Sequence, residues 1–88
     1  MTEKEFERVL KALANKRRLA ILRYLRKEKE ASVGDIAEEI KLSFRATSRH
    51  LSVLSGTNIL EKEQRNVQVF YRLSSDLPEP AQKIISIL

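Results

Sequence analysis

Four hydrogen-bonding side chains recur at helical spacing near the middle of the chain. They are Arg45, Ser48, Arg49 and Ser52, on a helix predicted over residues 43–55. Separations of three and four residues bring them to one face. Guanidinium and hydroxyl groups donate to phosphate oxygens and base edges, and an α-helix fits the major groove of DNA. The pattern therefore predicts a helix that reads DNA, although the same residue types also occur on helix faces that are merely solvated.

The charge around this helix suits a polyanionic partner. No Asp or Glu occurs from Lys41 to Leu60, a stretch that also holds His50. Carboxylates facing phosphate would repel it. The formal net charge is +5, and its whole excess lies within residues 1–30. Charge alone does not separate a binding face from a solvated one, but together with the helix pattern it favours nucleic acid.

A second, shorter helix is predicted immediately before this one. Its apolar residues have the spacing i, i+3, i+4, i+7, and they are Val33, Ile36, Ala37 and Ile40. Ser43 then suits the N-cap of the following helix, because its hydroxyl can accept a backbone N–H bond. Thr47, Leu51 and Leu54 are expected to line the inward face of that helix. The pair, at about residues 32–56, predicts a helix-turn-helix.

A two-stranded ribbon is predicted after the helix pair. Residues 59–64 and 67–73 are predicted to be strands, the second rich in Val, Phe and Tyr and alternating in polarity. Arg65-Asn66 is expected at the tip, since Asn tolerates the positive φ of a two-residue turn. Gly56 is expected to end the preceding helix in the left-handed conformation, which Asn58 also tolerates. The ribbon, at about residues 59–73, would form a wing beside the helix pair.

Helices are also predicted over about residues 3–13 and about residues 16–28, and a short terminal helix opens at Pro78 and Pro80. The first and last of these carry apolar stripes that predict a homodimer interface. The residues are Phe6, Val9, Leu10, Leu13, Ala81, Ile84, Ile85 and Leu88. The terminal stripe has a second interpretation, in which it closes the core of a single copy.

These elements predict one domain over residues 1–88, because the chain has no internal repeat and no linker. The fold class is mainly α with a small β-hairpin, in the order α-α-α-α-β-β-α. That order defines a winged helix-turn-helix, in which the second helix of the pair and the wing face DNA.

Three segments resemble the arsenical-resistance repressor (ArsR-type) family of regulators. They are LKALANKRRLAILRYL, SRHLSVL and VFYRLS, and the resemblance runs from about Phe6 to Ser74. Each motif is moderately specific, while their order and spacing together are strong. The resemblance implies a homodimeric repressor that binds a palindromic operator in double-stranded DNA until a signal releases it.

The chain departs from that family where metals are bound. The resemblance places a Cys-x-Cys pair at Ala31 to Asp35, but the sequence contains no cysteine, and its one histidine is His50. No metal and no cofactor are therefore expected. Glu61 and Glu63 also stand where the family's wing is commonly basic, which leaves Arg65 as the main cation expected there.

The predicted DNA contacts lie at the start of the helix over 43–55 and at the wing tip. They are Ser43, Phe44, Arg45, Thr47, Ser48, Arg49, His50, Arg65 and Asn66. Several of these have a simpler interpretation, in which Arg45 and Arg49 are ordinary solvent-facing helix residues. Ser48 can be a neutral surface residue, Phe44 can pack near the cap, and His50 can be partly buried.

Other classes of function fit poorly. An enzyme is not expected, because two glycines give no phosphate-binding loop and no nucleophile–base spacing is recognisable. The N-terminus lacks the apolar core of a signal peptide and no apolar run exceeds four residues, so a cytoplasmic protein without a membrane partner is expected. The serious rival is a winged-helix protein–protein interaction module, which the acidic wing favours mildly.

Overall fold

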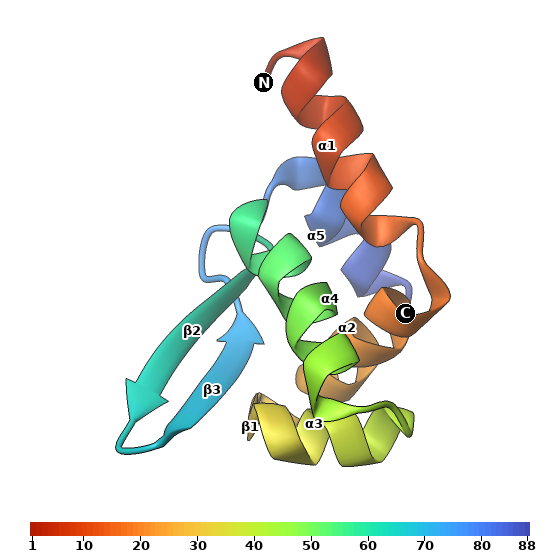
Figure 1. Ribbon diagram of the computed structural model, residues 1–88. Coiled ribbons are helices and arrows are strands. Elements are labelled where there is room, and N and C mark those ends of the chain that lie inside the picture. Colours follow the sequence, from red (N-terminus) through yellow and green to blue (C-terminus); the bar gives the residue numbers. More distant parts are fainter.

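The computed structural model describes all residues 1–88, and Figure 1 shows a helical body from which a β-hairpin projects. α1 reaches away from the body at one end, and α3 lies at the opposite end. The elements are α1 (Glu3–Leu13), α2 (Lys16–Glu28), β1 (Glu30–Ser32), α3 (Val33–Ile40), α4 (Phe44–Gly56), β2 (Leu60–Arg65), β3 (Gln68–Leu73) and α5 (Glu79–Ser86). This order confirms the predicted winged helix-turn-helix and adds one strand to it.

Side-chain caps fix where four helices begin. The four capping residues have extended backbone, and the side chain of each accepts a hydrogen bond from the backbone N–H three residues later. They are Thr2, Asn15, Ser32 and Ser43. Such caps satisfy amide groups that have no partner within the helix. The helices predicted over about residues 3–13 and 16–28 are confirmed.

The sheet has three antiparallel strands in the order β1-β3-β2. In β2 and β3, Lys62 lies opposite Tyr71 and Gln64 opposite Val69, so these four side chains share one face. β1 was not predicted, because its three residues gain strand geometry only by pairing with β3 from a distant part of the chain.

The turns differ in detail from the prediction. β2 and β3 begin one residue later than predicted, and the turn is Asn66-Val67, with Asn66 at φ 57. The expectation for Gly56 was wrong: Gly56 stays helical, and Asn58 takes the left-handed conformation at φ 62. A short polar side chain adopts that conformation readily, so the helix needs no glycine there.

One apolar cluster holds the elements together. Ile21, Leu22 and Leu25 of α2 are completely buried, as are Leu51 and Leu54 of α4. α2 packs against α3, α4, α5 and both β1 and β3, and so forms the centre of the domain. The core thus fixes the inner face of α4 and leaves its outer face to solvent.

Thr47 lies in this core with no exposed surface, and its Oγ1 has no hydrogen-bond partner. An unsatisfied buried hydroxyl costs about 1–3 kcal/mol. We therefore expect Thr47→Val, which keeps the shape and removes the hydroxyl, to raise the free energy of unfolding by about 1 kcal/mol. Urea melts at one fixed protein concentration measure this. Thr47→Ser is the control: it keeps the hydroxyl, deletes a methyl group and should destabilise. A Thr47→Val variant less stable than the parent would contradict the prediction.

Candidate nucleic-acid interface

The outer face of α4 is polar, basic and open. Arg45, Arg49 and Ser52 are exposed, and Ser48 is half-buried. Phe44 begins the helix with 63% of its surface exposed, so it lies outside the buried core. This face of α4 carries no carboxylate, because the sequence has no Asp or Glu from Lys41 to Leu60. Such a face suits contact with phosphates and base edges, as predicted.

Thr47 cannot belong to this surface. The predicted DNA contact at this position is wrong, because the side chain points into the core with 0% exposed. The same helical period that brings Arg45 and Arg49 outward turns Thr47, Leu51 and Leu54 inward. Thr47 therefore supports the surface from beneath.

His50 is attached to the body of the domain through Arg18. The Arg18 Nη1 lies 3.1 Å from His50 Nδ1, while the same guanidinium donates to the carbonyl oxygens of Lys11 and Ala12. Arg has only donors, so His50 Nδ1 must accept and the ring proton lies on Nε2. Burial, then the charges of Arg18 and Arg17, hold the pKa of His50 below its ordinary value. His50 is thus a neutral, partly buried residue, and its Nε2–H remains a donor.

The turn between α3 and α4 is held by a second arginine. Arg17 Nη1 donates to the Ile40 carbonyl at 2.9 Å, at the C-terminal end of α3. A cation there is favourable, because the last carbonyls of a helix have no partner and carry partial negative charge. Lys41 follows in the left-handed conformation at φ 55. Ser43 then caps α4 by accepting from the Ala46 N–H at 3.1 Å.

Arg65, which was predicted to be the main cation of the wing and a DNA contact, is paired with two carboxylates. Its guanidinium donates two hydrogen bonds to Glu30, at 2.7 and 2.9 Å, and two more to Glu63, at 3.0 and 3.1 Å. It also lies over the Phe70 ring, 4.5 Å from the centroid. Bidentate hydrogen bonds between Arg and a carboxylate are among the strongest in proteins. Because Glu30 belongs to β1, Arg65 joins β1 to the hairpin. Asn66, beside it, is an exposed turn residue.

All the wing carboxylates lie on the sheet face that carries Arg65. Arg72 Nη1 lies 3.2 Å from Glu63 Oε1, and Arg72 Nε lies 3.3 Å from Glu61 Oε1. The hydrogen bonds of Arg65 lower the pKa of Glu63, and the backbone N–H and hydroxyl of Ser75 lower that of Glu61. The wing is therefore acidic on one face only, and those acids are already paired.

The apolar stripes of α1 and α5 divide into two sets. Val9, Leu13, Ala81 and Ile85 are buried within one copy, so they close its core and cannot form an outer interface. This confirms the second interpretation for part of the terminal stripe. The other predicted interface residues, Phe6, Leu10, Ile84 and Leu88, keep exposed or half-exposed surface beside Ile87, which is 80% exposed.

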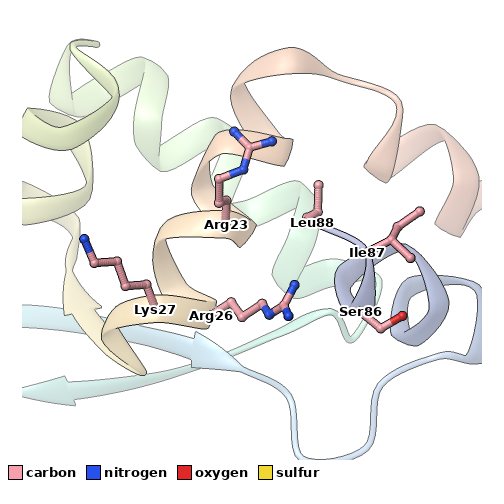
Figure 2. Close-up of a pocket in the computed structure, with 6 residues that line it drawn as sticks. All are labelled: Arg23, Arg26, Lys27, Ser86, Ile87 and Leu88. Carbon is pink, nitrogen blue, oxygen red and sulfur yellow. The ribbon is translucent and has the colours of Figure 1, made fainter.

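A basic hollow elsewhere belongs to the packing of the last helix. Arg23, Arg26 and Lys27 of α2 line this hollow together with Ser86, Ile87 and Leu88, and Figure 2 shows that Arg26 extends toward the end of α5 whereas Lys27 extends away from it. Arg26 Nη1 donates to the Ile85 carbonyl at 2.8 Å and so joins the end of α5 to α2. No three His, Cys, Asp or Glu side chains gather where a metal ion could be held. No helix has the length and apolar character needed to cross a membrane.

Sequence reasoning missed several residues of this surface. Lys62 and Gln64 lie on the wing face toward α4, and Arg18 supports His50. Strand alternation could have found Lys62 and Gln64, because they share a face with the buried Leu60. The role of Arg18 depends on a contact across 32 positions of the sequence, which no local pattern reveals.

The fold and the open face of α4 define a winged helix-turn-helix domain. Residues 15–62 match the family model described as bacterial regulatory protein, arsR family. The match spans more than half of the chain and includes both helices of the pair. The protein belongs to the ArsR family of bacterial regulators.

Similar proteins agree with this assignment. The transcriptional activator HlyU of Vibrio cholerae is 42% identical over 67 residues, which are 76% of this chain and 61% of HlyU. The nodulation protein NolR of Rhizobium meliloti is also 42% identical over 67 residues, 76% of this chain and 54% of NolR. The chain thus spans less than two thirds of either relative.

A solved structure supports the same fold. The homodimeric winged helix-turn-helix DNA-binding domain of a possible ArsR-family transcriptional regulator from Mycobacterium bovis superposes with a TM-score of 0.80. The two are 28% identical, over 96% of this chain and 74% of that one.

The paired carboxylates make stability sensitive to acid. Hydrogen bonds from Arg65 hold the pKa of Glu30 below its ordinary value of 4.5. The unfolded chain then binds protons more readily than the folded one, so the stabilisation is complete above pH 4.5 and is lost as the pH falls below it. We expect Glu30→Gln to be less stable than the parent at pH 7 and to lose less stability on acidification. Urea melts from neutral to acidic pH measure both.

Glu7→Gln is the control, because Glu7 and Lys11 are both exposed and their charged atoms lie 3.9 Å apart. Parallel pH profiles for the parent and Glu30→Gln would show that the Arg65 pair adds nothing to stability.

Proposed function

We propose that the protein is a sequence-specific transcriptional regulator, a homodimeric repressor that binds a palindromic operator in double-stranded DNA. α4 enters the major groove, and the β2–β3 wing contacts the flanking backbone. Occupation of the operator blocks transcription. The names of HlyU, an activator, and of the possible regulator from M. bovis support a role in transcription.

The observation that best supports DNA binding is that α4 has one buried apolar face and one exposed basic face. Leu51 and Leu54 are completely buried, while Arg45 and Arg49 project from the opposite side with no carboxylate beside them. An Arg side chain can make a bidentate contact to guanine, and Ser48 and Ser52 can donate to either bases or phosphate. A rigid helix with this outer face is the geometry that direct readout requires.

The protein-interaction alternative loses its main support. It drew on the acidic wing, but Glu61 and Glu63 lie on the face away from α4 and are paired with Arg65 and Arg72. The carboxylates of the wing therefore do not lie beside the outer face of α4.

The homodimer is proposed from the apolar side chains that α1 and the residues after α5 leave exposed. Phe6 and Leu10 on α1 are 47% and 42% exposed, and Ile87 after α5 is 80% exposed. α1 and α5 pack against each other, so these residues belong to neighbouring elements. A two-fold axis through this surface would bury it against its own copy.

We expect Arg45→Ala and Arg49→Ala to weaken binding to the operator. Loss of a bidentate contact to guanine should cost about 1–3 kcal/mol and relax base preference at one position. Loss of a phosphate contact should instead weaken all duplexes alike. Two copies about a two-fold axis require half-sites about 10 bp apart or a multiple of that. Affinity is measured on a palindrome selected from random duplex DNA and on its scrambled form.

Ser86→Ala on α5 provides the control, because its hydroxyl bonds only to the Lys83 carbonyl. If both arginine variants bind every duplex as the parent does, α4 does not read DNA and the protein-interaction alternative takes its place.

We expect Phe6→Glu to convert the dimer to a monomer, because it would bury a charge at the proposed interface. Sedimentation at micromolar concentration measures the assembly. Phe44→Glu is the matched control: it places the same charge at an exposed aromatic residue outside the interface and should leave the dimer intact. A parent protein that sediments only as a monomer would refute the proposed dimer.

A further inference from the structure

The wing presents a second, uncommitted face toward α4. Lys62 and Gln64 of β2 lie directly opposite Tyr71 and Val69 of β3, and all four line a hollow of about 290 Å³. Phe44 and Ser48 of α4, together with Val33 of α3, complete its walls. The hollow therefore lies between the recognition helix and the wing.

A second hollow continues from this one along α4. Phe44 and Ser48 line both, and the second also takes in Arg45, Arg49 and Ser52. The two form one trough from the outer face of α4 to the inner face of the wing. No Asp or Glu lines either part.

Lys62 is the cation of the wing that has no acidic partner. The other two, Arg65 and Arg72, lie on the opposite face within 4.0 Å of Glu30 and Glu63, and Lys62 takes part in no ion pair. Strand alternation accounts for this separation, because positions 61, 63 and 65 point away from positions 62 and 64. One face of the wing is thus a closed ion-pair network, and the other offers a single free ammonium group.

We propose that the trough seats the sugar–phosphate backbone of one DNA strand, and that Lys62, not Arg65, is the wing residue that contacts phosphate. This inference depends on the proposed function and specifies how the wing takes part in it. When a helix occupies the major groove, the strand bordering that groove must pass between the helix and any element reaching the adjacent groove. The trough occupies that position.

The lining matches the chemistry of such a strand. Lys62 supplies a positive charge for a phosphate, and Ser48 and Gln64 supply neutral donors. Phe44, Val69 and Tyr71 supply an apolar wall for a deoxyribose. The absence of carboxylates from the lining leaves no group that repels phosphate.

The test is the salt dependence of affinity for the selected palindrome and for a scrambled duplex. Each phosphate neutralised contributes about 0.9 to the slope of log affinity against log salt. We expect Lys62→Gln to weaken binding to both duplexes alike and to lower the slope by about 0.9. Lys62→Arg, which keeps the charge, should restore the slope of the parent.

Two further variants serve as controls. Lys27→Gln removes the same charge from α2, outside the trough, and should leave the slope unchanged. Arg65→Gln should also leave the slope unchanged, because Arg65 already serves Glu30 and Glu63. A slope that falls with Arg65→Gln and not with Lys62→Gln would overturn the assignment.

The outcomes separate this inference from the proposed function. If Arg45→Ala and Arg49→Ala weaken binding while Lys62→Gln keeps the parent's slope, the trough does not hold the backbone although α4 reads DNA. If the parent protein binds no duplex, the proposed function fails, and this inference fails with it.

Discussion

The whole proposed surface depends on the burial of one face of α4. Leu51 and Leu54 are completely enclosed by the core that α2 organises, so the helix cannot rotate about its axis without exposing them. Side chains of that size are worth roughly 1.5–3 kcal/mol each when buried. The outer arginines are therefore fixed in direction by residues that never meet a ligand. Arg18 adds a polar attachment at His50, and Arg17 fixes the turn before the helix.

The same principle of two faces governs the wing. Alternation along β2 places a carboxylate–arginine network on one side and Lys62 with Gln64 on the other. The net charge of the wing segment is consequently a poor guide to its function. Residues 59–73 hold three basic and two acidic side chains, but this sum does not reveal that Glu61 and Glu63 are paired with Arg65 and Arg72 while Lys62 has no acidic partner.

Local chemistry explains what could be predicted from the sequence. The helices over about residues 3–13 and 16–28 could be predicted, because the apolar period of each and a break at Asn15 lie within a few positions of the sequence. β1 could not be predicted, since three residues acquire strand geometry only from their distant partner β3. The left-handed residue after α4 was misplaced for another reason: Gly56 and Asn58 both tolerate that conformation, and only the path of the chain into β2 selects Asn58.

The residues of the candidate site likewise divide into those that local sequence patterns identify and those whose role depends on distant contacts. Arg45, Ser48 and Arg49 could be identified from helical period alone, because their outward direction follows from the inward direction of Leu51 and Leu54. Arg65 was misjudged because its partner Glu30 lies 35 positions away. A basic residue at a turn can bind phosphate only if no carboxylate of the protein is paired with it. Whether such a carboxylate lies nearby depends on the tertiary fold, which local sequence patterns do not show. The third strand, absent from the predicted ribbon, is what brings Glu30 to the wing and leaves Lys62 as the cation facing α4.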